Sequence, residues 1–592
     1  MRQFFKNLLS SFFGSFLAIG ILFLISFAIL FSMLDIFSSS VNNKVIVEES
    51  NFIKISIESQ IVEYAEEHPL ANLEFAEEFF PKKTGLFQIR QTLKIAAKDD
   101  KIKGVYLKLG MFPGGFGQAE EIREQLMKFK KSGKSVIIYG DSFDEKSYYI
   151  ATAADYIGLN PMGLLEFNGL RAEVLYFTGL FEKLGIEVNI FKAGRYKSAV
   201  EPFFKKEMSS ENREQLLAFL GGIQIALEDA TAKARGLDIK QVQLIADSML
   251  IRSAANAKAQ KFVDVVDYEI DFLKLFKKSI SLKQIKLVNY DAYNSVKEIE
   301  LHPSTDKVVV LFSEGEIIYG KSSENKRIGH VSVNKQLQKL TADSTVKAIV
   351  LRINSPGGSG HASDLMWKQL QETRKYKPVI ASMSDYAASG GYYMAMACDE
   401  IVAYPMTITG SIGVFGMFPT FGEFMKDKLG VTSDRVKTGA YSDMFSINRK
   451  MTKEEKQIVT TQVQDFYRVF VQKVADARGK SFDEIDEVAS GRVWTGKQAS
   501  ENGLVDYLGG IDEAVKLAIS KTDYKELQLV SYNKLIEDDT ESILGSSTPE
   551  TIHLTTPNLY QDKTVIQYIN LLEKLNTCKG IQARLPFELE IK

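Results

Sequence analysis

A serine within a run of small residues is the strongest candidate nucleophile in the sequence. Ser389 follows Ala387 and Ala388 and is followed by Gly390 and Gly391. The residues before Ser389 read as a strand and those after it as a helix, which places the hydroxyl at a helix N-terminus. Free N–H groups and the helix dipole favour developing negative charge there. A serine at this position can also simply cap the helix, so the nucleophile hypothesis needs a partner base.

A serine hydroxyl stays protonated near pH 7 and needs a base to attack a carbonyl group. Lys197 is the candidate base, because it lies in an apolar and aromatic run that fits partial burial. Burial can lower the pKa of a lysine by several units from its usual value of about 10.4 and leave a neutral amine.

Histidine is the more usual base, and the chain has five histidines: His68, His302, His330, His361 and His553. His361 follows a Pro-Gly-Gly turn and is the only plausible candidate among them. A catalytic triad also needs a carboxylate that orients the histidine, and none can be placed. We therefore interpret His361 as structural.

The Pro-Gly-Gly turn is a candidate oxyanion site. It ends the apolar run Lys347–Ile353, and its glycines Gly357 and Gly358 can turn backbone N–H groups toward a developing oxyanion. Gly390, or Ser389 itself, would supply a second donor. Pro-Gly-Gly alone is equally typical of a plain turn.

The elements that must position these residues occur twice. Several short segments recur at an offset of about 244 residues, which indicates a duplicated domain rather than a short repeat. The matching pairs are Lys103–Leu109 with Lys347–Ile353, Pro113–Gly115 with Pro356–Gly358, Val136–Ile138 with Val379–Ala381, and Tyr148–Ala151 with Tyr392–Ala395.

The two copies have kept different residues. The first copy has lost the serine and both glycines that surround position 389, and Lys197 aligns with Ser442 of the second copy. One copy therefore keeps the lysine and the other keeps the serine. A shared site at the junction of the copies explains this pattern better than two separate losses.

Each copy predicts an α/β unit with a parallel sheet, because buried strands alternate with helices. We expect helices at 118–131 and 362–375, and longer polar helices near 209–235 and 453–478. The predicted domains are 1–40, an N-terminal transmembrane anchor; 45–300, the first repeat; 301–535, the second repeat; and 536–592, a tail of unknown role.

The N-terminus predicts a membrane anchor. Residues 7–34 contain no charge, and a run of this length can cross a bilayer as one helix. Arg2 and Lys6 precede it, so the positive-inside rule places the body on the extracytoplasmic side of the inner membrane. A cleaved signal peptide ending near Ser38–Ser40 is the alternative, which the length of the apolar run disfavours.

Composition excludes other classes. The net charge of -2 gives no basic surface for nucleic acid. The two cysteines form neither a disulfide framework nor a metal pattern, and we expect no cofactor.

Several motifs together resemble the long, two-domain form of signal peptide peptidase A over residues 45–535. They are Arg352–Gly358, Ala387–Tyr393, Thr409–Val414, Arg195–Ala199 and Arg492–Gly496. The resemblance implies a crotonase- or Clp-protease-like fold in each half, with Ser389 as nucleophile, Lys197 as base, Ser411 hydrogen-bonded to the lysine and a glycine N–H such as that of Gly357 in the oxyanion hole. It also implies a homotetramer that degrades remnant signal peptides at the membrane.

Three other interpretations stay open. A crotonase-type acyl-CoA enzyme shares the expected fold but needs neither Ser389, Lys197 nor an anchor. A non-enzymatic membrane scaffold would not need a serine and a lysine kept in complementary copies. A penicillin-binding or β-lactamase type of site can be assembled from Ser323–Lys326 and Lys437–Gly439. The repeat argues against it, because Lys437–Gly439 is the counterpart of Lys192–Gly194.

Overall fold

A computed structural model describes most of the chain. The described residues are 19–24, 51–65, 83–280, 284–298, 306–322, 327–532 and 581–584. Within these ranges no helix is both long enough and apolar enough to cross a bilayer. Residues 19–24 are helical, but the predicted anchor lies for the most part outside the described residues.

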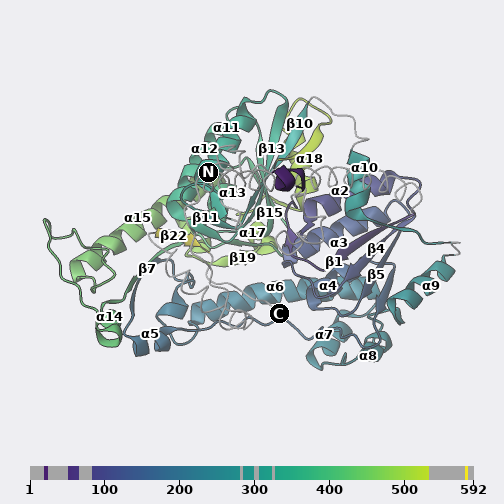
Figure 1. Ribbon diagram of the computed structural model, residues 1–592, viewed down its shortest axis with the longest axis horizontal. Helices are drawn as coiled ribbons and strands as arrows, with labels where there is room; N and C mark the ends of the chain where they lie inside the picture. The colour runs from purple at the N-terminus through teal and green to yellow at the C-terminus, as the bar shows by residue number, and fades with distance from the viewer. Residues whose placement is uncertain are drawn as a thin grey trace, which may run out of the picture.

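The first copy folds around a six-stranded parallel sheet (Figure 1). Its strands, in spatial order, are β8 (Val265–Val266), β6 (Tyr156–Leu159), β5 (Ser135–Gly140), β4 (Gly104–Leu109), β1 (Phe52–Ile57) and β9 (Leu287–Asn289). The central strands are buried and rich in valine, isoleucine and leucine, as expected for a sheet covered on both faces. The helices of this part are α2 (Leu86–Lys98), α3 (Phe116–Lys130), α4 (Glu145–Ala151), α7 (Ile239–Asp247), α8 (Ala254–Ala259), α9 (Glu269–Ser279) and α10 (Tyr290–Glu298).

The second copy repeats this arrangement. Its main sheet has the order β19 (Val493–Thr495), β17 (Ile408–Gly410), β15 (Val379–Ala388), β13 (Val346–Ser355), β10 (Lys307–Glu314) and β21 (Gln528–Tyr532), with β16 (Glu400–Ala403) and β20 (Tyr507–Leu508) alongside. Its helices are α11 (His330–Ala342), α12 (Gly360–Thr373), α13 (Gly390–Ala395), α16 (Phe482–Val488), α17 (Gly496–Glu501) and α18 (Ile511–Ser520). The prediction of two tandem α/β units is confirmed.

A third sheet joins the two copies. Its order is β12 (Arg327–Gly329), β11 (Glu316–Ile318), β14 (Gly357–Ser359), β22 (Ile581–Arg584), β18 (Val414–Thr420) and β7 (Glu187–Ala193). β7 belongs to the first copy and pairs antiparallel with β18 of the second along seven residues. The residues that follow β7 are thereby fixed against the second copy.

Two long helices also cross between the copies. α6 (Ser210–Arg235) packs against β19, and α15 (Lys453–Arg478) packs against β7. Ser209 and Thr452 cap their N-termini, and Gly236 and Gly479 end them in the left-handed conformation that favours glycine. α5 (Thr178–Leu184) and α14 (Gly422–Leu429) lie together at the end of an arm that projects from the body (Figure 1).

Candidate active site

Ser389 lies between the end of β15 and the start of α13, as the sequence predicts. Its backbone has φ 55° and ψ −110°, an unfavourable conformation for a residue with a side chain. Two hydrogen bonds hold it there: its N–H donates to the carbonyl of Gly410 at 2.8 Å, and its carbonyl accepts from the N–H of Tyr393 at 2.8 Å. In this conformation the hydroxyl contacts Lys197, which lies four residues after the end of β7.

Lys197 reaches this hydroxyl from the first copy. Its Nζ lies 2.9 Å from Ser389 Oγ, 2.9 Å from Ser411 Oγ and 3.1 Å from the carbonyl oxygen of Ser411. The Ser389 hydroxyl also donates to the carbonyl of Gly413 at 3.3 Å. The structure therefore brings together the serine and the lysine that the two copies kept separately.

Lys197 is more deeply buried than its sequence context predicts. The side chains of Lys197, Ser389 and Ser411 are all 0% exposed. This burial lowers the pKa of Lys197 well below 10.5, because a charged amine would lose its hydration without gaining a carboxylate partner. A lysine in this setting is neutral over a wider pH range than a solvated one.

Gly491 packs directly against the backbone and Cβ of Lys197. The sequence analysis did not identify this residue. Its φ is +77°, and a Cβ atom on it would lie 2.7 Å from both the Cβ and the backbone nitrogen of Lys197. Its N–H donates to the carbonyl of Ile412 at 2.8 Å, and the N–H of Ser411 donates to the carbonyl of Arg492 at 2.6 Å. The only signal in the sequence is that Gly491 directly precedes the Arg492–Gly496 motif.

The Pro-Gly-Gly turn lies beside the serine. Gly357 and Gly358 have φ of +97° and +154°, and a Cβ atom on Gly357 would lie 2.8 Å from the amide nitrogen of Gly390. The N–H of Gly357 donates to Ser355 Oγ at 3.2 Å. The N–H of Gly357 therefore has an internal acceptor, which argues against this residue as an oxyanion donor. Of the other two predicted donors, Gly358 lies within β14, between β11 and β22, and Gly390 begins α13.

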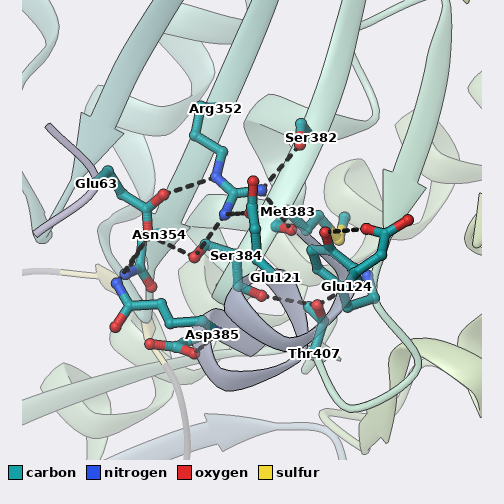
Figure 2. Close-up of polar contacts among 12 residues, drawn as sticks. Glu63, Glu121, Glu124, Arg352, Asn354, Ser382, Met383, Ser384, Asp385 and Thr407 are labelled. Atoms are coloured by element: carbon teal, nitrogen blue, oxygen red, sulfur yellow. Dashed lines mark hydrogen bonds and ion pairs between the residues drawn. The ribbon is translucent and has the colours of Figure 1, made fainter. Parts of the chain in front are cut away.

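A buried polar cluster fixes the strands that carry these turns (Figure 2). The guanidinium of Arg352, on β13, donates to Glu63 at 2.7 Å and to Glu121 at 2.5 Å. Asn354 Nδ2 donates to Glu63 at 3.1 Å, and the N–H of Tyr386 donates to Asn354 Oδ1 at 3.2 Å. The cluster therefore links β13, which ends at the glycine turn, to β15, which ends at Ser389, and to the first copy.

Asp385 adds a second link between the copies. Its carboxylate accepts from the N–H of Gly115 at 3.1 Å and of Gln118 at 2.8 Å, at the start of α3. Burial raises the pKa of Asp385 to about 7 and that of Glu121 to about 7. Burial also raises the pKa of Glu120 to about 8, although the N–H of Met406 donates to that carboxyl at 2.7 Å.

Two segments of the chain, residues 128–283 and 371–525, match the sequence pattern of peptidase family S49. Together they cover just over half of the chain. The chain belongs to peptidase family S49.

Three relatives resemble the chain over most of its length. It is 36% identical to Protease 4 of Haemophilus influenzae over 74% of each chain. It is 32% identical to the chloroplastic serine protease SPPA of Arabidopsis thaliana, over 84% of this chain and 73% of the plant protein. It is 33% identical to Protease 4 of Salmonella typhi, over 80% of this chain and 79% of the relative. The resemblance to signal peptide peptidase A is confirmed, and the S49 chain is a serine protease.

The fold agrees with this assignment. Residues 301–407 match the Clp protease pattern, and they include β13, the glycine turn, β15 and Ser389. The S49 chain thus has two tandem domains of mixed α/β, Clp-protease-like fold.

The other candidate residues lie elsewhere in the S49 chain. His361 is exposed on α12, and its ring lies 5.4 Å from that of Tyr319. Lys437 lies in an exposed turn and is paired with Asp443 at 3.0 Å. Residues 323–326, the other half of the penicillin-binding type of site, lie outside the described residues.

Proposed function

We propose that this S49 protease is a Ser/Lys endopeptidase in which Ser389 is the nucleophile and Lys197 the general base. The observation that carries the proposal is the 2.9 Å contact between Lys197 Nζ and Ser389 Oγ in a fully buried site. A neutral amine has two N–H groups, which the two oxygens of Ser411 accept, and one lone pair, which is left for Ser389. In this state the Ser389 hydroxyl rotates from the Gly413 carbonyl and donates to that lone pair. Ser411 is thus the residue that orients the base.

The reaction follows from this arrangement. Lys197 takes the proton of Ser389 as Oγ attacks the carbonyl carbon of a peptide. The N–H groups of Gly358 and Gly390 stabilise the oxyanion, and the protonated lysine then gives its proton to the leaving amine. Water hydrolyses the acyl-enzyme by the same steps, with Lys197 again as the base.

We also propose the setting that the family resemblance implies. The uncharged run at 7–34 anchors the protein in the inner membrane, with the body on the extracytoplasmic side, where remnant signal peptides are the substrates. Exposed apolar side chains, among them Leu429, Val436 and Phe445, support association with other copies of the chain. The number of four subunits comes from the family resemblance. Digestion of spheroplasts with an added protease tests the topology, because the body should be accessible before the membrane is lysed.

Single substitutions test the proposed dyad. We expect Ser389→Ala and Lys197→Ala each to lower kcat on a fluorogenic peptide by about 10³-fold or more, because nucleophile and base act as a unit. His361→Ala is the matched control and should stay within a few-fold of the wild type. An inactive His361→Ala variant beside an active Lys197→Ala variant would show that the base is the histidine.

A further inference from the structure

Lys197 lies on a turn that follows β7, outside any helix or strand, so hydrogen bonds around the turn fix its position. The N–H of Lys197 donates to the carbonyl of Gly194 at 3.1 Å, and the N–H of Tyr196 donates to the carbonyl of Ser490 in the second copy at 2.9 Å. The carbonyl of Tyr196, which leads directly into the lysine, accepts from the side chain of Gln215 at 3.1 Å. A side chain of α6 thus helps to hold the turn.

Gln215 is 0% exposed, and its carboxamide bridges the two copies. Its Nε2 lies within hydrogen-bond distance of three first-copy acceptors, the carbonyl of Tyr196 at 3.1 Å, Ser198 Oγ at 2.7 Å and Asn212 Oδ1 at 3.1 Å. Its Oε1 accepts from the N–H of Val493, the first residue of β19 in the second copy, at 3.2 Å. A backbone carbonyl can only accept and a backbone N–H can only donate, so these two partners fix the orientation of the carboxamide.

The bridge also leads to the serine that contacts the amine. The residue before Val493 is Arg492, and its carbonyl accepts from the N–H of Ser411 at 2.6 Å. Ser411 Oγ in turn lies 2.9 Å from Lys197 Nζ. Gln215 therefore connects the backbone that carries the lysine to the backbone that holds Ser411.

The second copy has no such side chain at the equivalent place. α6 and α15 have the same length, and each begins after a capping hydroxyl residue and ends before a left-handed glycine. The sixth residue of α6 is Gln215, whereas the sixth residue of α15 is Ile458, which packs partly buried against the core of the second copy. Of these two helices, only the one beside the lysine turn has a polar side chain at this position.

We propose that Gln215 is a positioning residue of the protease, which holds the turn of Lys197 at a fixed distance from Ser411 across the junction of the two copies. The inference rests on the proposed function of Ser389 and Lys197. The hydrogen bonds of Gln215 do not reach Ser389 Oγ or Lys197 Nζ, so it acts through the position of the amine. A carboxamide does this without a charge, whereas a carboxylate in the same buried place would favour the ammonium form of the lysine.

Gln215→Met tests the bridge, because methionine keeps the length of the side chain and removes these hydrogen bonds. The carbonyl of Tyr196 and the N–H of Val493 then lose a buried partner, so the turn can separate from β19 and admit water to the amine. We expect kcat on a fluorogenic peptide to fall at least about tenfold and KM to stay within about twofold, since the base moves and the substrate contacts do not. The pH midpoint of Ser389 labelling by a fluorophosphonate should rise toward 10.5, because burial lowers the pKa of Lys197.

Gln215→Glu is the second variant. Its side chain has nearly the same shape and still accepts from the N–H of Val493. We expect its labelling midpoint to lie above that of the wild type, because the carboxylate stabilises the protonated form of Lys197. This variant decides the question even if Gln215→Met does not fold.

Gln498→Met is the matched control, because Gln498 also bridges the copies. Its Nε2 donates to the carbonyl of Ala218 on α6 at 3.3 Å, and its Oε1 accepts from the N–H of Thr495 at 3.0 Å. Neither bond involves the turn of Lys197, so kcat and the labelling midpoint of this variant should stay close to the wild-type values.

The inference and the proposed function fail in different ways. A labelling midpoint that is unchanged in both Gln215 variants, beside inactive Ser389→Ala and Lys197→Ala chains, would overturn the positioning role and leave the proposed function intact, whether or not kcat falls. Peptide hydrolysis retained in Ser389→Ala would overturn the proposed function itself.

Discussion

At the scale of single residues, the geometry of the candidate site depends on residues beyond the proposed nucleophile Ser389 and the proposed base Lys197. Ser389 and Ser411 both have positive φ, and each follows the end of a strand, β15 or β17, beside the amine of Lys197. Backbone strain of this kind persists only where the surroundings fix it, and it is common at active sites. The geometry around the lysine amine therefore depends on several turns at once.

Gly491→Ala should lower activity by more than the strain of an alanine at positive φ accounts for. The added methyl group would lie 2.7 Å from Lys197 Cβ, so the lysine must move away from Ser389. We expect kcat to fall at least about tenfold, since misplacing a catalytic group is costly. Gly479→Ala is the matched control, because φ there is +61° and nothing lies within 4 Å of the added atom. Equal activity and equal unfolding midpoints in the two variants would refute the packing argument.

At the scale of elements, the sequence predicts what is local. The run from β15 through Ser389 into α13, and the long helices α6 and α15, lie close to where patterning and capping residues put them. The parallel strands of the two main sheets follow from buried strands alternating with helices, whereas the antiparallel pairing of β19 with β17 in the second copy does not. These features depend on neighbours in sequence, which is why one sequence is enough to find them.

The third sheet was beyond prediction for a physical reason. β7 and β18 come from segments more than 200 residues apart, and β14 is a three-residue strand of two glycines and a serine. Neither hydrophobic alternation nor length marks such strands, and only tertiary packing selects their partners. Of the site, Ser389 and Lys197 follow from comparison of the two copies, and Ser411 follows only from the family resemblance. Gly413 lies inside the Thr409–Val414 motif but had no predicted role, and Gly491 was not predicted.

The buried carboxyl group of Glu120, on α3, should make the free energy of unfolding depend on pH. Burial raises the pKa of Glu120 to about 8 from 4.5, so between these values the folded chain holds a proton that the unfolded chain releases. The contribution is therefore stabilising below about pH 4.5 and is lost as the pH rises toward 8. In Glu120→Gln the amide oxygen still accepts from the N–H of Met406. We expect the unfolding midpoint of this variant to fall less between pH 6 and pH 8 than the unfolding midpoint of the wild type falls.

Glu372→Gln serves as the control for that comparison. Ion pairs with Lys368 and Lys375 lower the pKa of Glu372 to about 2, so it does not titrate in this range. An unfolding midpoint that changes with pH equally in the wild type and both variants would mean that Glu120 is ionised throughout.

At the scale of the whole molecule, duplication has produced one active site from two domains. Lys197, the proposed base, comes from the first copy, Ser389, the proposed nucleophile, and Ser411 come from the second, and β7 and β18 join them within one chain. Because each long helix also packs on the other copy, the two domains cannot separate without losing the contact between Lys197 and Ser389.

This intrachain arrangement predicts the outcome of mixing two inactive variants. Lys197→Ala and Ser389→Ala chains expressed together should stay inactive on a fluorogenic peptide, even if they assemble with one another, because neither chain holds both groups. The wild type diluted into Ser389→Ala chains should keep activity in proportion to its amount. Recovery of activity in the mixed variants would mean that the dyad forms between chains.

The pH dependence of phosphonate labelling tests the central claim most directly. The rate constant for modification of Ser389 by a fluorophosphonate reports the reactivity of the serine without peptide binding or product release. Since the pKa of Lys197 lies well below 10.5, we expect this rate to rise with pH along one ionisation with its midpoint well below that value. Ser411→Ala should move the midpoint, and Lys197→Ala should abolish the rise. A rate independent of pH between about 6 and 10, or one unchanged in Lys197→Ala, would contradict a lysine base.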